Sequence, residues 1–163
     1  IIKDRILNHY GVKATMGKMH ISYRSTLSEQ ITKTLTSSHI HEGKTQTATL
    51  TFQMIPNERG KGNHLKFEYQ DMEKTSEVVQ RAIEEGVKSA WNMGVLGYPI
   101  EDMQVIVKEI EMNGEEVPLI ALRKCALKLV LSALDQEDLV LLEPIMSVEV
   151  MKFFHSKRNF EFF

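Results

Sequence analysis

The stretch that most constrains the fold runs over residues 77–107 and has the sequence EVVQRAIEEGVKSAWNMGVLGYPIEDMQVIV. Apolar residues recur in it at helical spacing, while charged residues fall on the other faces, which predicts an amphipathic helix with one buried stripe. That stripe consists of Val79, Ile83, Val87, Ala90 and Trp91. The helix is expected to end at Gly94, and a turn at residues 97–99 leads into a strand over residues 103–107. A helix of this kind needs a sheet to cover.

The sheet is predicted by alternation of apolar and polar residues in the first half of the chain. Residues 47–54 alternate Ala48, Leu50, Phe52 and Met54 with threonine and glutamine, and similar patterns occur around residues 21–23, 31–35 and 65–69. Such a period of two is typical of half-buried antiparallel strands with one wet face.

A second helix is predicted in the C-terminal third of the chain. Residues 111–116 suggest a turn, Pro118 occupies a favourable first helical position, and residues 140–150 predict a last strand that is broken by Pro144. The apolar stripe of this helix consists of Leu122, Cys125, Ala126, Leu129, Val130 and Ala133. The order of elements therefore predicts an α+β fold, with a mostly antiparallel sheet and two helices packed on one face.

Composition limits the functional classes. With 163 residues, 42% of them hydrophobic, the chain can form one domain with a substantial core, and no apolar run approaches the roughly 20 residues that a membrane helix needs. Cys125 is the single cysteine, so an internal disulfide is excluded, and a buried packing role is favoured over a catalytic thiol. The net charge of −2 divides into +5 over residues 1–70 and −7 over residues 71–163, which fits either a nucleic-acid surface or an ordinary solvated exterior.

Catalytic motifs are weak. The phosphate-loop pattern GxxxxGK[ST] is absent, so no GTP-binding site is expected in this chain. His39, His41 and Glu42 suggest zinc, but a metal site needs three or four converging ligands, and a solvated loop is the favoured interpretation. Adjacent acids such as Glu101 and Asp102, and the pair Ser37-Ser38, are expected to be turn or surface features. We therefore expect no catalytic residue, cofactor or metal in the chain.

Three segments in order resemble one known family. They are residues 1–27, residues 77–107 and the motif LLEPIMSVEV at residues 141–150, and together they are similar to the region from the end of domain III through domain IV of elongation factor G, a translational GTPase. The resemblance implies a ribosomal protein S5 domain 2-like fold. It also implies boundaries: residues 1–16 end domain III, 17–142 form domain IV, 143–150 begin domain V, and 151–163 are an atypical tail.

The resemblance places function in two loops at the distal end of domain IV, which should lie together. In this chain they correspond to residues 37–46, SSHIHEGKTQ, and residues 111–117, EMNGEEV. The ribosome-contacting residues implied are Ser38, His39, His41, Gly43, Lys44, Asn113, Gly114 and Glu115. Both loops depart from the bacterial translocase, whose first loop is close to GGRGQYG and whose second contains HDVDSS.

These departures make the chain resemble the mitochondrial second form of elongation factor G, ribosome-releasing factor 2, which splits ribosomes together with ribosome recycling factor. The resemblance then implies a monomeric lever that contacts ribosomal RNA in the mitochondrial matrix, with GTP and Mg bound elsewhere in the parent protein. A cytoplasmic location, and a translocase with diverged tip loops, are alternatives. A free RNA-binding module that uses Lys33, Lys44, Arg59 and Lys61 is another, and a small-molecule enzyme would need a glycine-rich phosphate motif that is absent.

Overall fold

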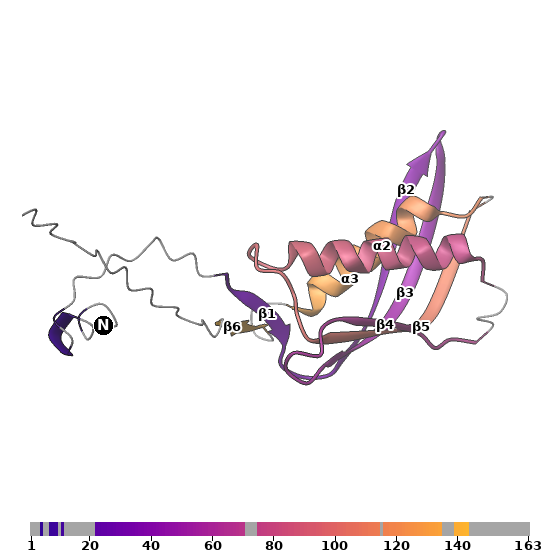
Figure 1. Cartoon of the computed structure of the whole chain (residues 1–163). Helices are drawn as coiled ribbons and strands as arrows, with labels where there is room; N and C mark the ends of the chain where they lie inside the picture. Colours follow the sequence, from indigo (N-terminus) through magenta and orange to yellow (C-terminus); the bar gives the residue numbers. More distant parts are fainter. Residues whose placement is uncertain are drawn as a thin grey trace, which may run out of the picture.

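The computed structural model describes residues 4, 7–9, 11, 22–70, 75–114, 116–134 and 139–143. The described elements follow the predicted order of strands, helix, strand, helix and strand (Figure 1). They are β1 (Arg24–Leu27), β2 (Ile31–His41), β3 (Lys44–Pro56), β4 (His64–Phe67), α2 (Glu77–Met93), β5 (Met103–Asn113), α3 (Leu119–Ala133) and β6 (Leu139–Leu142). Most of the predicted domain III segment 1–16, the segment 144–150 and the tail 151–163 lie outside the described residues.

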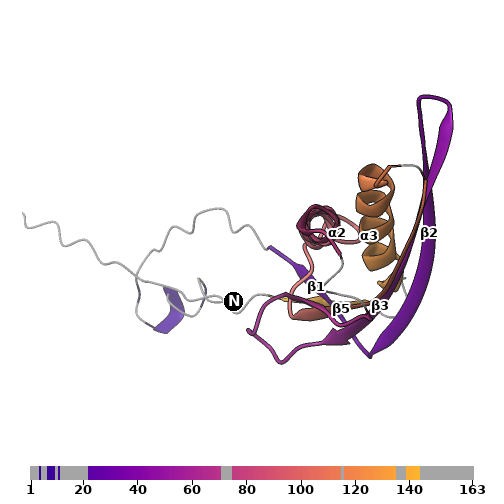
Figure 2. The ribbon, with the colours of Figure 1, turned by 90° about the vertical axis from the view of Figure 1, so that its right-hand side faces the viewer.

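The main sheet has four strands in the order β2-β3-β5-β4. β2 with β3 and β3 with β5 pair antiparallel, whereas β4 pairs parallel to β5, and α2 connects these two parallel strands. Both α2 and α3 lie on one face of this sheet (Figure 2). The predicted α+β architecture, with a mostly antiparallel sheet and two helices on one face, is therefore confirmed.

The core lies between β3, β5 and the two helices. The predicted alternation in β3 is confirmed, because Leu50, Phe52 and Met54 are each fully buried. Both helical stripes are also buried as predicted. The helices approach closely at Gly86, where an added Cβ would lie 2.5 Å from the carbonyl oxygen of Arg123 and 2.8 Å from the Ala126 Cβ.

α2 ends where the sequence predicts. Gly94 caps it with φ 58° and ψ −176°, a backbone conformation that glycine alone adopts readily, and its N–H donates to the Ala90 carbonyl oxygen. A Cβ at Gly94 would lie 1.7 Å from the Tyr98 carbonyl oxygen, so the chain turns back against the helix end. α3 begins at Leu119 with Pro118 as its N-cap, one residue later than predicted. No helix in the described part of the chain is long and apolar enough to cross a membrane.

The pairing of β3 with β5 contains a β-bulge. Thr51 pairs with Glu109 and Phe52 with Val107, so Lys108 is an extra residue on β5. Beyond it, Ile110 packs against the core, and Glu109 accepts a hydrogen bond from Thr51 Oγ1 at 3.0 Å. The strand continues to Asn113, so it is longer than the predicted strand over residues 103–107, and the predicted turn at residues 111–116 was wrong for residues 111–113.

The first and last described strands do not join the main sheet. β1 and β6 form a separate antiparallel pair, which corrects the expectation of a single sheet. Ser25 connects this pair to the segment before β5 through hydrogen bonds. Its backbone N–H donates to the Pro99 carbonyl oxygen at 2.9 Å, and its hydroxyl donates to the Tyr98 carbonyl oxygen at 3.0 Å. Its carbonyl oxygen accepts a hydrogen bond from the Glu101 backbone N–H.

Asp102 has a structural role that the sequence did not reveal. Its side chain is 4% exposed, and its carboxylate accepts hydrogen bonds from the backbone N–H groups of Gly60 at 3.0 Å and Gly62 at 2.8 Å. Burial raises the pKa of this carboxyl, but the hydrogen bonds and the nearby Arg59 outweigh burial, and the net pKa lies below its usual value. Asp102 was expected to be a turn or surface feature: it lies at a bend with φ 57°, but it is buried and it anchors the loop between β3 and β4.

Candidate functional site at the tip of the sheet

The first predicted loop is a β-hairpin. β2 continues to His41 and β3 begins at Lys44, so only Glu42 and Gly43 form the turn, with φ 48° and 76°. Positive φ at both central residues is typical of a type I′ turn, which matches the twist of the flanking strands. The prediction of a loop over residues 37–46 was therefore wrong. Ser37, expected at a turn or on the surface, is buried within β2.

The second predicted loop lies at the same end of the molecule. Thr47 pairs with Asn113, the last residue of β5, and Gly114 then leaves the sheet with φ 149°. A Cβ at Gly114 would lie 3.3 Å from Gln46 Cγ, which shows how close the two segments come. The expectation that both loops share one end is confirmed (Figures 1 and 2). The second loop begins only at Gly114, because residues 111–113 belong to β5.

The predicted site residues divide between the two faces of the hairpin. His41 pairs with Lys44 and His39 with Gln46, and paired residues in an antiparallel ladder project to the same side. By the alternation of strand side chains this is also the side of Ser37, Ala48 and the helices. Ser38 projects to the opposite face, and Glu115 lies outside the described residues.

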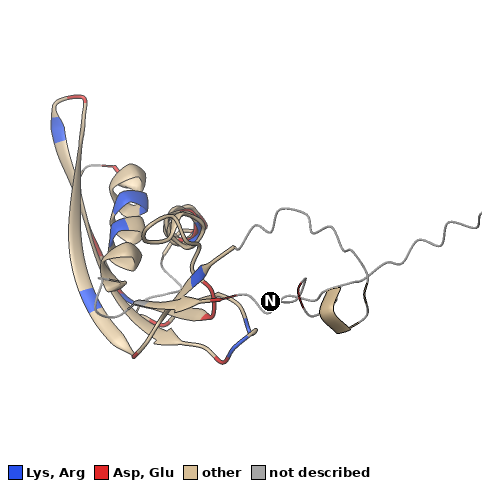
Figure 3. Cartoon of the chain, turned by 90° about the vertical axis from the view of Figure 1, so that its left-hand side faces the viewer, with Lys and Arg blue, Asp and Glu red and all other residues tan. Residues whose placement is uncertain are grey.

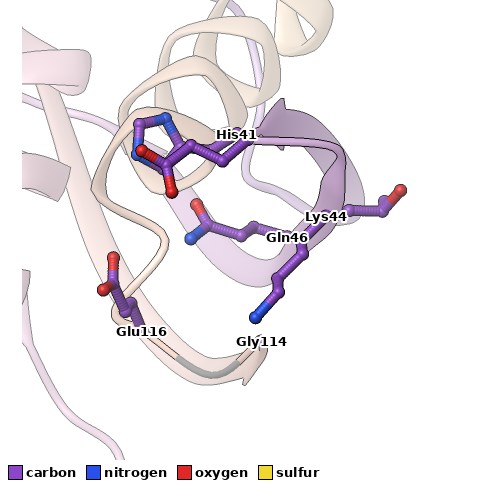
Figure 4. Close-up of a pocket in the computed structure, with 7 residues that line it drawn as sticks. His41, Lys44, Gln46, Gly114 and Glu116 are labelled. Atoms are coloured by element: carbon purple, nitrogen blue, oxygen red, sulfur yellow. The ribbon is translucent and has the colours of Figure 1, made fainter.

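A pocket of about 410 Å³ lies between the hairpin and the second loop. Figure 4 shows the side chains of His41 and Gln46 on the side that also holds Glu116, with Lys44 reaching toward Gly114. Its lining residues are His41, Glu42, Lys44, Thr45, Gln46, Gly114 and Glu116. The sequence had placed His41, Lys44 and Gly114 among the predicted ribosome-contacting residues and had considered Glu42 only as a metal ligand. Thr45, Gln46 and Glu116 were included only as members of the loop ranges.

The tip carries more negative than positive charge. Residues 38–47 and 111–117 contain the glutamates Glu42, Glu111, Glu115 and Glu116, against the single lysine Lys44. Basic positions are spread over the hairpin, α3 and the loop before β4 (Figure 3). The basic balance of residues 1–70 therefore does not gather at the tip.

Comparison with known proteins identifies the family. A model described as "Elongation factor G, domain IV" matches residues 19–128, which is more than half of the chain. The chain belongs to the elongation factor G, domain IV family. The resemblance carried by the three sequence segments is thereby confirmed.

Full-length relatives include several forms of elongation factor G. The chain is 27% identical over 160 residues to elongation factor G 1 of Treponema denticola, and 29% identical over 162 residues to elongation factor G 2 of Syntrophomonas wolfei. It is 28% identical over 154 residues to the mitochondrial ribosome-releasing factor 2 of Danio rerio. These alignments cover 93%, 93% and 92% of the chain but 23%, 22% and 20% of the relatives, so the chain spans about a fifth of their length.

A solved structure supports the elongation factor G domain IV fold. The crystal structure of a protein from Thermus thermophilus superposes with a TM-score of 0.66 at 22% identity, over 85% of this chain and 20% of that chain. At this identity the likeness concerns the fold alone, and it agrees with an S5 domain 2-like α+β arrangement.

Two side-chain hydrogen bonds join β2 to α3 in the covered part of the sheet, beneath the tip. Lys33 Nζ donates to the Ser132 carbonyl oxygen, and Cys125 Sγ donates to the Leu35 carbonyl oxygen at 3.0 Å. Burial raises the pKa of the Cys125 thiol, and the residue is fully buried as predicted. Both side chains join β2 to α3 beneath the tip.

The imidazoles of the hairpin do not converge with other ligands. His39 and His41 lie on one strand, and the described residues contain no group of three or more histidine, cysteine, aspartate or glutamate side chains able to hold a metal ion. Within that part of the chain, the hairpin offers hydrogen-bonding groups and planar rings, not a metal cage.

A second pocket lies at the end of the folded domain opposite the tip. It measures about 420 Å³, and its lining includes Arg24, Lys88, Trp91 and Glu101. Arg24 Nε pairs with Glu101 at 2.9 Å, while Trp91 Nε1 has no hydrogen-bond partner among the described residues. None of its lining residues comes from the tip segments or from the predicted site.

Proposed function

We propose that this chain is the ribosome-contacting lever of a translational GTPase that acts in ribosome disassembly after termination. The observation that supports the proposal most directly is the meeting of the hairpin and the β5–α3 loop in one pocket at the end of the sheet. A sheet covered by two helices is rigid enough to carry such a tip, because its core is closely packed. In this proposal GTP and Mg bind elsewhere in the parent protein, and the chain alone has no turnover.

Disassembly is preferred over translocation because of the tip chemistry. Residues 37–46 contain one glycine and one lysine, and the two tip segments together contain four glutamates in their sequence. Close approach to a phosphate-rich tRNA–mRNA duplex needs small residues and cations, which this tip supplies sparsely. Ribosome recycling factor is the partner proposed for this reaction, and the mitochondrial matrix is the proposed location. A translocase with diverged tip loops is the alternative, and relatives named elongation factor G and ribosome-releasing factor 2 match this chain at 27–29% identity alike.

The test is to graft residues 17–142 into an otherwise intact elongation factor G and to measure translocation and subunit splitting separately. Subunit splitting in the presence of recycling factor, with weak translocation, is expected. The matched control is the same graft with residues 40–45 replaced by a two-residue turn, which should lose splitting while the grafted protein stays folded. Robust translocation without splitting would reject the proposal.

A free RNA-binding module is less well supported. Of the four cations that it would use, Lys33 already donates to the Ser132 carbonyl oxygen, and Arg59 lies beside the buried Asp102 carboxylate. Salt-sensitive RNA binding that weakens in parallel on neutralising Lys33, Arg59 and Lys61 would favour this module instead.

A further inference from the structure

We infer that the tip pocket is a binding site for a single unstacked nucleobase, with guanine as the preferred base. This inference rests on the proposed function, because it names the ligand that the ribosome would present to the tip. It concerns the pocket walls provided by His41, Gln46, Gly114 and Glu116.

Three side chains of the pocket have unused hydrogen-bonding or stacking capacity. Within the part of the chain that the structure describes, His41, Gln46 and Glu116 form no side-chain hydrogen bond or ion pair. Glu116 and His41 are exposed, Gln46 is half-buried, and all three line the same hollow. Gly114 carries no side chain, which leaves that wall open; a Cβ there would lie 3.3 Å from Gln46 Cγ.

These groups match the chemistry of a base better than that of a phosphate. A carboxylate only accepts hydrogen bonds, an amide both donates and accepts, and a histidine ring is a stacking platform for unpaired bases. A phosphate would meet the Glu42 and Glu116 carboxylates as well as the one cation of the pocket lining, Lys44, so acidic groups outnumber basic ones there. An uncharged base avoids that repulsion and still uses each of the three side chains.

Guanine is favoured because its Watson–Crick edge offers two adjacent donors, N1–H and the N2 amino group, to the two oxygens of one carboxylate. Glu116 would accept both, while the Gln46 amide donates to O6 and the His41 ring stacks on the base. Adenine offers one donor beside one acceptor on that edge, so one carboxylate oxygen would be left facing an acceptor. Adenine is therefore disfavoured because its binding would leave one hydrogen-bonding group of the site without a partner.

The experiment uses the 163-residue chain and short RNA hairpins that each carry one bulged nucleotide in an identical stem. Binding to guanine, adenine and inosine bulges and to a fully paired stem is measured by fluorescence anisotropy at one salt concentration. Guanine is expected to bind about tenfold more tightly than adenine, and inosine, which lacks the N2 amino group, should fall between them. The fully paired stem should bind weakest.

Substitutions at the pocket then separate base reading from charge. Glu116→Gln should weaken guanine binding about tenfold and remove the preference over adenine, and Gln46→Ala should act in the same direction. The matched control Glu29→Gln alters an exposed glutamate in the turn before β2 and should leave all affinities unchanged. Circular dichroism checks that each variant is folded.

Several outcomes would overturn the inference. Equal affinity for all four RNAs, or no measurable binding to any of them, would exclude a base-selective pocket. If Glu116→Gln strengthens binding to every RNA equally, the carboxylate merely repels phosphate. If an arginine-rich peptide binds more tightly than the guanine bulge and Glu116→Gln abolishes that binding, the pocket takes a basic protein segment. Each outcome is independent of the graft experiment, which decides whether the chain supports ribosome splitting at all.

Discussion

The covered part of the sheet and its tip are built from the same two strands but differ in what holds them. In the covered part, Leu50, Phe52 and Met54 of β3 are fully buried beneath the helices, whereas Ile40 near the end of β2 is 69% exposed. The ladder between β2 and β3 is continuous from Ile31 to His41, so the tip is kept in place by backbone pairing to the covered part. Stability is therefore expected to reside in the covered part, and substitutions at the tip should change it less.

The largest contrast between the two parts is expected from truncating one apolar side chain in each. Phe52→Ala should reduce the free energy of unfolding by about 3–5 kcal/mol, because it removes buried apolar area and leaves a cavity. Ile40→Ala, at the tip, should change it by less than about 0.5 kcal/mol. Urea denaturation of both variants is the measurement; similar losses would show that the tip is part of the core.

The helix end near the covered part supplies the next test. Gly94→Ala should cost about 2–4 kcal/mol of unfolding free energy, since the added Cβ would collide with the Tyr98 carbonyl oxygen in a backbone conformation that alanine avoids. Gly97 also has positive φ but meets no atom within 4 Å, so Gly97→Ala is the matched control and should cost about 1–2 kcal/mol. Thermal unfolding of the two variants separates the effect of the steric collision from that of backbone strain. Equal decreases in Tm would contradict the close approach of Gly94 to the Tyr98 carbonyl oxygen.

A smaller and pH-dependent effect is expected at Asp102. Its pKa is lower in the folded chain than its usual value, so the ionised carboxylate stabilises the fold above its unfolded pKa of about 3.9. This contribution is lost as the pH falls through the lower folded pKa. Asp102→Asn should therefore reduce the free energy of unfolding by about 1–3 kcal/mol at neutral pH, and the difference from the native chain should shrink in acid.

The control for Asp102 is Glu101→Gln, which changes an exposed neighbouring acid that pairs with Arg24 at the surface. Its effect should stay within about 0.5 kcal/mol. Denaturation at several pH values measures both variants. A constant difference between Asp102→Asn and the native chain across the acid range would show that the carboxylate charge does not bind the glycine loop.

The smallest effect is expected at the tip itself. Gly43→Ala should cost about 1 kcal/mol, because φ is 76° at the second turn position, while Gly43→Asn should cost only a few tenths because a type I′ turn accepts asparagine there. Hydrogen exchange of the amides in β2 and β3 is the measurement. Faster exchange is expected at the hairpin in Gly43→Ala, with the amides beneath α3 unchanged.

The covered part could be predicted from the sequence, because its signals are local and repeated. The stripes of α2 and α3 and the alternation of β3 each depend on spacing within one element, and all three are buried as expected. The hairpin was missed as a hairpin because serine, threonine and histidine on β2 give no clear apolar alternation over residues 36–41, and a Glu-Gly turn is a weaker signal than Asn-Gly.

The features that escaped prediction depend on contacts between distant residues. The burial of Asp102 was not predicted because its partners, Gly60 and Gly62, lie about forty residues away and only the folded chain brings them together. Gln46 and Glu116 fell within the two predicted loops, but nothing in the sequence distinguished them until the structure placed both in one pocket. Only the three-segment resemblance predicted that the site lies at this end of the molecule.

The extra residue in β5, Lys108, determines which of the following side chains face the helices. Before it, the odd-numbered residues Val105 and Val107 face the helices; after it, the even-numbered Ile110 does, opposite Leu50. Removing one residue there would invert the strand from that point on, turning Glu109 toward the apolar layer and Ile110 toward water. Gly114 and Glu116 would reach the end of the sheet displaced by one position. The geometry of the tip pocket therefore depends on a single inserted residue midway along β5.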